Sequence, residues 1–127
     1  MGKLVNYDIV INIEQITNIS GADQYFEVTF SAKNGMEFKI IFDQVWDMRW
    51  SIENASIERF CNFREFQQEE LIKNSIYVVE DSEYIGYFEK QVSGTRPIDK
   101  LRHFIIYDNV NTTLDILSNR GPTILKI

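Results

Sequence analysis

The strongest constraint on the fold is an alternation of apolar and polar residues on both sides of Lys33-Asn34-Gly35. The apolar positions before and after this tripeptide are Phe26, Val28, Phe30, Ala32, Met36, Phe38, Ile40 and Phe42. A period of two is typical of strands that bury one face. A two-residue turn at Asn34-Gly35 would place Phe30 opposite Lys39 and turn one apolar face to solvent. A three-residue loop with Gly35 in the left-handed conformation places Phe30 opposite Phe38, so we expect that hairpin.

Alternation also predicts strands at the start of the chain and after the hairpin. Over residues 5–13 the odd positions are apolar, and the segment 18–24 that follows favours a turn because it contains Gly and Asp. Further along, the even positions are apolar and are expected to be buried: Trp46, Met48, Trp50 and Ile52. The odd positions there are expected to face solvent: Asp47, Arg49, Ser51 and Glu53. Residues 53–61 fit either a helix or a strand.

Two helices are expected in the middle of the chain. Residues 63–75 are rich in good helix formers. Ser82 is a suitable N-cap for a second helix, which Gly94 and Pro97 would end. The segments 75–80, 102–108, 112–118 and 123–127 predict further strands. The predicted fold is a single α+β domain over residues 1–127, mainly an antiparallel sheet of about seven to nine strands with two helices inserted around residues 63–92 and a strand order left open.

The net charge of −6 is distributed unevenly along the chain. Residues 65–89 hold seven acidic residues and one basic residue. Repulsion of phosphate makes nucleic acid an unsuitable ligand, whereas an acidic surface favours capture of a basic protein. No apolar run is long enough for a membrane span, and the first residues do not resemble an export signal. We therefore expect a cytoplasmic protein with no nucleic-acid or membrane partner.

Residues suited to catalysis, metal binding or cofactor binding are sparse. His103, the only histidine, lies in an apolar strand segment, so we interpret it as a hydrogen-bonded sheet residue rather than a general base. Cys61 is the only cysteine, which excludes an internal disulfide and zinc motifs built on paired thiols, and favours a buried apolar role. The glycines are scattered, so no phosphate-binding loop is predicted. We predict no catalytic residue, no metal ligand and no cofactor.

The candidate partner-binding residues form two groups. The first joins the predicted solvent-facing side of a strand to an acidic helix and consists of Asp47, Arg49, Glu53, Glu65, Glu69 and Glu70. The second surrounds the start of the second predicted helix and consists of Asp81, Glu83, Tyr84 and Tyr87. Aromatic residues and Arg are favoured interface anchors, and acidic rims steer association. A charged surface that serves only solubility would have the same composition.

Three stretches carry a resemblance to known proteins: FDQVWDMRWSIENASIERF, YVVEDSEYIGYFEKQVSGTRP and LRHFIIYDNVNTTLDILS. They resemble small acidic single-domain proteins of Gram-positive bacteria that lack an assigned activity. Such proteins are similar in character to immunity proteins, which neutralise a toxin by binding it. The resemblance implies inhibition by occlusion and transfers no functional residue, because immunity surfaces differ between toxin pairs.

The sequence thus favours a non-enzymatic protein-binding domain, in its sharpest form an immunity-type inhibitor that occludes a basic, toxin-like protein. The first alternative is a small-molecule-binding or structural domain with an aromatic pocket between sheet and helices, which an apolar cavity containing Trp46 or Trp50 would favour. The second is a hydrolase whose carboxylates come from Asp43, Asp47 or Glu53, although Arg49 is the more natural partner of the last two. An exposed edge strand could equally support a homodimer.

Overall fold

The hairpin around Lys33-Asn34-Gly35 is present in the computed structural model, which describes residues 2–8, 11–52, 63, 65, 74–92, 100–108 and 112–127. Strand β3 (Tyr25–Ala32) pairs with β4 (Glu37–Phe42), and Phe30 lies opposite Phe38. Gly35 has a φ of 83°, and the Ala32 N–H donates to the Met36 carbonyl at 2.8 Å. The three-residue loop is therefore confirmed, together with the register that its side chains require.

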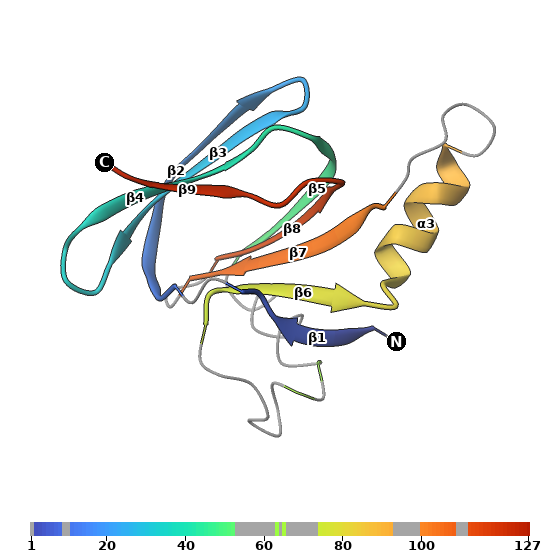
Figure 1. Cartoon of the computed structure of the whole chain (residues 1–127), viewed down its shortest axis with the longest axis horizontal. Coiled ribbons are helices and arrows are strands. Elements are labelled where there is room, and N and C mark those ends of the chain that lie inside the picture. Colours follow the sequence, from blue (N-terminus) through green and yellow to red (C-terminus); the bar gives the residue numbers. More distant parts are fainter. Residues whose placement is uncertain are drawn as a thin grey trace.

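The described residues contain nine strands in two antiparallel sheets and one helix, α3 (Glu83–Gln91) (Figure 1). The five-stranded sheet, called sheet A, has the order β1-β6-β7-β8-β5, and the four-stranded sheet B has the order β2-β3-β4-β9. The bounds of the remaining strands are β1 Lys3–Asn6, β2 Ile13–Ala22, β5 Val45–Ile52, β6 Ile76–Glu80, β7 Arg102–Tyr107, β8 Thr112–Ser118 and β9 Thr123–Lys126.

The main core lies between the two sheets. Sheet B contributes Ile13, Phe26, Val28, Phe30, Ile40 and Phe42, and sheet A contributes Ile76, Phe104, Ile106, Leu114 and Ile116. The rings of Phe42 and Phe104 meet edge to face across this core, with centroids 5.4 Å apart. The apolar residues whose alternation predicted the hairpin therefore form the face of sheet B that packs on sheet A.

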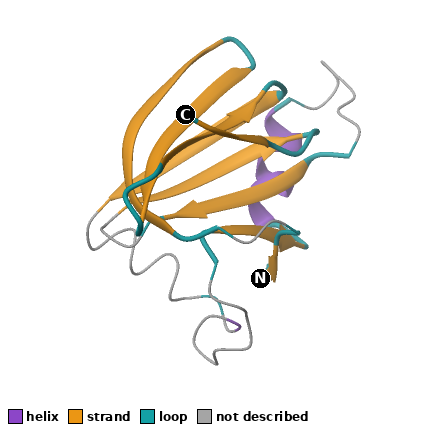
Figure 2. Cartoon of the chain, turned by 60° about the vertical axis from the view of Figure 1, so that its left-hand side comes forward, coloured by secondary structure: helices purple, strands orange, loops and turns teal. Residues whose placement is uncertain are grey.

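The opposite face of sheet A carries helix α3, which lies behind the strands in Figure 2. Tyr84 and Phe88 of α3 pack with Leu117 of β8, and Trp46 of β5 packs against this cluster. Because both faces of sheet A are covered along β7 and β8, those strands are buried at almost every position, and the apolar run of β7 is the part of this that the sequence indicated. The molecule is a mainly antiparallel β protein of one domain.

Three parts of the sequence-based fold need correction. The strands form two sheets rather than one, and the N-terminal alternation is divided: β1 joins sheet A, whereas β2 joins sheet B. Strand β2 also continues to Ala22, through most of the segment 18–24 in which a turn was predicted. The described residues contain one helix, α3, which begins after Ser82 as predicted. The other predicted helix, 63–75, lies outside the described residues except at Phe63, Glu65, Asn74 and Ser75, and Cys61 also lies outside them.

The predicted burial of β5 was wrong in a specific way. Pairing of β5 with β8 shifts register between Val45 and Asp47, which marks a β-bulge at Trp46. Trp46 consequently packs beneath α3, while Met48 packs in the core between the sheets. Trp50 and Ile52 lie at the end of this edge strand and are 60% and 50% exposed.

Candidate functional site

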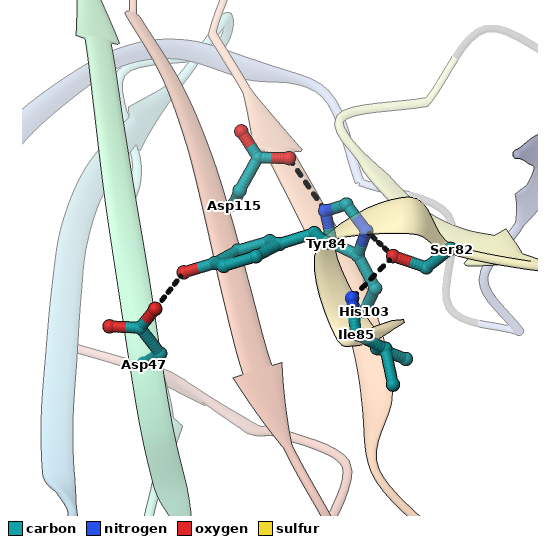
Figure 3. Close-up of polar contacts among 6 residues, drawn as sticks. All are labelled: Asp47, Ser82, Tyr84, Ile85, His103 and Asp115. Atoms are coloured by element: carbon teal, nitrogen blue, oxygen red, sulfur yellow. Dashed lines mark hydrogen bonds and ion pairs between the residues drawn. The ribbon is translucent and has the colours of Figure 1, made fainter. Parts of the chain in front are cut away.

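Helix α3 begins at Ser82, whose side chain connects the helix to sheet A. The Ser82 Oγ accepts a hydrogen bond from the Ile85 N–H at 3.2 Å, which makes Ser82 the N-cap. The same Oγ lies 2.7 Å from His103 Nδ1, and His103 Nε2 lies 2.6 Å from Asp115 Oδ1 (Figure 3). We call Ser82, His103 and Asp115 the cap network, because it joins the α3 N-cap to β7 and β8.

The donors and acceptors of the cap network fit a neutral imidazole. With the ring hydrogen on Nε2, the Ser82 hydroxyl accepts from the Ile85 N–H and donates its own hydrogen to His103 Nδ1. Nε2 then carries the remaining ring hydrogen and donates it to the Asp115 carboxylate. His103 is 2% exposed and Asp115 is 0% exposed. These hydrogen bonds therefore take the place of those that water would make with the two side chains at the surface.

Tyr84 of α3 forms a second connection, to β5. Its hydroxyl donates to Asp47 Oδ2 at 2.8 Å (Figure 3), and its ring meets the His103 ring edge to face. The Arg49 guanidinium lies 3.8 Å from the centroid of the Tyr84 ring. Burial, followed by the hydrogen bond to Asp47 and the charge of Asp47, raises the pKa of Tyr84, because each favours the neutral phenol.

The outer side of α3 is exposed and combines aromatic and acidic side chains. Tyr87 is 56% exposed, lies 5.9 Å from the Arg49 guanidinium and accepts a hydrogen bond from Gln91 at 3.0 Å. Glu83 precedes Tyr87 by one helical turn, and Glu80 and Asp81 are exposed just before the helix. We call Glu80, Asp81, Glu83, Tyr87 and Arg49 the α3 surface.

The cap network has the same order of residues as a catalytic Ser-His-Asp triad, but its hydrogen bonds cap helix α3 and hold it on the sheet. In nucleophilic catalysis a serine hydroxyl must reach a substrate carbonyl while histidine removes its proton. Here the Ser82 Oγ already accepts the Ile85 N–H, and the imidazole is enclosed by α3 and the sheet. The arrangement fixes the N-terminus of α3 on sheet A and thereby sets the position of the α3 surface.

The structure brings three of the predicted partner-binding residues together around a fourth, Tyr84. Asp47 is hydrogen-bonded to Tyr84, and Arg49 stacks on the Tyr84 ring. Tyr87 lies near Arg49 from the next turn of α3. Arg49, Tyr87, Asp81 and Glu83 are exposed, whereas Asp47 is half-buried. Arg49 faces solvent as expected, whereas the expectation was wrong for Asp47, because its carboxylate is half-buried under α3 and bonded to Tyr84.

Other predicted residues are differently placed. Glu65 is buried and accepts a hydrogen bond from the Leu4 N–H, so its carboxylate holds β1 rather than meeting a partner. Tyr84 is also buried, and it supports the α3 surface from below. Glu53, Glu69 and Glu70 lie outside the described residues. Of the carboxylates considered for hydrolysis, Asp43 pairs with Arg120 at 2.9 Å and Asp47 bonds to Tyr84.

Sequence reasoning missed Ser82 as a partner of His103, and it missed Asp115 altogether. The available signal was a single carboxylate in TTLDILS, which has no other charged residue, and a single histidine in RHFIIYD. A buried charge in a strand requires a partner, so the two residues could have been matched had the pairing of β7 with β8 been known. Their strands pair with Ile105 opposite Asp115, which makes His103 the diagonal neighbour of that carboxylate.

The described part of the chain lacks a clustered metal site and a membrane-spanning helix. It contains no group of three or more His, Cys, Asp or Glu side chains that could hold a metal ion. Its helix is too short and too polar to cross a membrane. A scan against protein-family models, a search of curated proteins and a search of solved structures each found no match for this chain.

Proposed function

We propose that this chain is a non-enzymatic protein-binding domain that meets its partner through the α3 surface. The observation that carries the proposal is the exposed Tyr87 ring, which lies beside an arginine that is itself stacked on a buried tyrosine. Tyrosine and arginine are enriched among residues that dominate binding energy. Both side chains stand on regular elements, so a partner would lose little energy in ordering them.

Charge defines the partner that suits this surface. Glu80, Asp81 and Glu83 are exposed together where β6 meets α3, and Glu89 is exposed on the same helix. Such a concentration of carboxylates raises the rate at which a basic protein is captured. The sharpest form of the proposal is an immunity-type inhibitor that covers the working surface of a basic, toxin-like protein.

The test is an affinity capture from the source cell with a matched pair of variants. Wild-type protein is immobilised, exposed to lysate at low salt and eluted at high salt, and the eluted polypeptides are identified. We expect stoichiometric retention of one basic polypeptide. Tyr87→Ser should reduce its retention about ten-fold, because a central aromatic anchor is lost.

Tyr25→Ser is the control, because Tyr25 is also an exposed tyrosine, 44% accessible, but lies on β3 of sheet B. It should leave retention unchanged. The proposal is contradicted if no polypeptide is retained, or if the two variants reduce retention equally.

A further inference from the structure

We propose that two copies of this chain associate through the outer edges of their β5 strands, antiparallel, with Met48 of both copies at the two-fold axis. Asp47 of each copy then lies opposite Arg49 of the other. Sheet A of one molecule would continue into sheet A of the second across this contact. The contact proposed for a basic protein shares Arg49 with this one, but the inference rests on the edge of β5 and does not depend on that proposal.

The first support is the position of β5 in its sheet. β5 is the last strand in the order β1-β6-β7-β8-β5, and no described strand pairs with its outer edge. An edge strand presents backbone N–H and C=O groups that can pair with another chain. The side chains at this edge are unusually apolar for a solvent-facing strand end, since Trp50 and Ile52 are 60% and 50% exposed.

The second support is that symmetry restricts the register. In a continuous sheet with a two-fold axis perpendicular to it, one residue pairs with its own copy, and residues on either side pair symmetrically. A centre at Asp47 or at Arg49 places identical charges directly opposite each other, which is destabilising. A centre at Met48 places Asp47 opposite Arg49 twice. Among these three registers, the Met48 centre alone converts both charges of β5 into attractive cross-strand pairs.

The third support is the conformation of the two charged side chains. Asp47 and Arg49 occupy the α3 face of β5, because both contact Tyr84. They therefore lie on the same face, as residues two apart in a strand do, and each can reach across the edge to its opposite in a second copy. Asp47 Oδ2 is bonded to Tyr84, which leaves Oδ1 as an acceptor for an arginine from the other molecule. The Arg49 guanidinium stacks on the ring of Tyr84 and is exposed, so it is accessible to a second molecule.

The test exchanges the charges at positions 47 and 49 and measures the molecular mass of the protein in solution. Wild-type protein should show a concentration-dependent dimer by sedimentation or light scattering. Asp47→Arg alone creates two arginine–arginine oppositions in the self-pair, and Arg49→Asp alone creates two aspartate–aspartate oppositions. Each variant should therefore dimerise more weakly than wild type by about ten-fold or more.

The decisive sample is an equimolar mixture of the two single variants. A heterodimer of Asp47→Arg with Arg49→Asp contains only opposite-charge pairs in this register, so mixing should restore dimers that neither variant forms alone. A wild-type protein that is monomeric at every concentration would overturn the proposal, and so would a mixture that stays monomeric while both variants retain the wild-type circular dichroism spectrum.

A second measurement fixes the register even if a charge variant folds poorly. With Cys61 replaced by serine, Met48→Cys should form a disulfide with its own copy on mild oxidation, because residues at the axis are directly opposite. Trp50→Cys in the same background is the comparison. A dimer that cross-links through position 50 and not through position 48 would place the axis at Trp50 and overturn the register proposed here.

Discussion

The residues that decide how α3 is held are a histidine and an aspartate that solvent does not reach. His103 bonds to Ser82 on one side and Asp115 on the other, so its two ring nitrogens connect the helix cap to the sheet interior. A buried carboxylate is costly unless its partners are correctly placed. The pair therefore makes the position of α3 specific, because a displaced helix would break the cap and disturb the buried bond together.

Removing the imidazole should be strongly destabilising. His103→Ala deletes the 2.6 Å partner of Asp115 and the 2.7 Å partner of Ser82, so we expect a loss of about 3 kcal/mol in the free energy of unfolding. Urea denaturation measures it. Adding Asp115→Asn should recover part of the loss, because a neutral amide tolerates burial better than a carboxylate. Equal stability of His103→Ala and wild type would show that the cap network does not stabilise the fold.

The raised pKa of Tyr84 leads us to expect a loss of stability at high pH. Its pKa is raised in the folded protein, by burial first and then by Asp47, above the ordinary value of 10.0. Stability linked to its neutral phenol is fully present below about pH 10 and is lost as the pH rises toward the folded-state pKa, because the unfolded chain ionises first. The free energy of unfolding should therefore fall between about pH 9 and about pH 11 more in wild type than in Tyr84→Phe.

Part of the decline should persist in Tyr84→Phe, because burial also raises the pKa of Tyr77. At neutral pH the same variant should cost about 1 kcal/mol, since it removes the hydrogen bond to Asp47. Tyr25→Phe on sheet B is the control and should change neither quantity. Parallel pH profiles for Tyr84→Phe and wild type would contradict the proposed role of the phenol.

The β3–β4 hairpin and the β5 strand show why one element could be predicted and the other could not. In the hairpin, the turn chemistry of Gly35 and the positions of four apolar pairs agree, so the register followed from local sequence. In β5 the alternation is just as regular, but a bulge at Trp46 changes which face the tryptophan occupies. The bulge arises from pairing with β8, about 70 residues away in the sequence, which local alternation does not reveal.

Two glycines should respond oppositely to the same substitution. Gly35 has a φ of 83° in the hairpin loop, so Gly35→Ala should lower the free energy of unfolding by about 1 kcal/mol although the new methyl group meets no atom within 4 Å. Gly86 lies inside α3 with equally open surroundings, so Gly86→Ala should raise that energy by about 1 kcal/mol. Thermal unfolding measures both changes. The same sign for both would contradict the assigned loop or the assigned helix.

Across the whole molecule, the sequence predicted the antiparallel β character and the capped second helix, but not the division into two sheets. The division depends on how β1 and β2 separate, and their shared alternation gives no sign of it. Local sequence patterns are limited in the same way for the α3 surface. Asp81, Glu83 and Tyr87 could be selected from local composition, whereas the approach of Arg49 to Tyr84 requires β5 and α3 to lie together. Local patterns specify elements, and long-range packing decides which residues meet.

The most direct test of the proposed function is the rate at which the retained basic polypeptide associates with charge-reversed protein. Glu80→Lys/Glu83→Lys reverses two exposed carboxylates of the α3 surface and avoids Asp81, whose φ of 53° disfavours lysine. Glu14→Lys/Glu37→Lys makes the same change in net charge on sheet B and is the control. At low salt we predict an association rate about ten-fold lower for the first variant than for the control, converging at high salt. Equal rates for the two variants at low salt would contradict a binding role for the α3 surface.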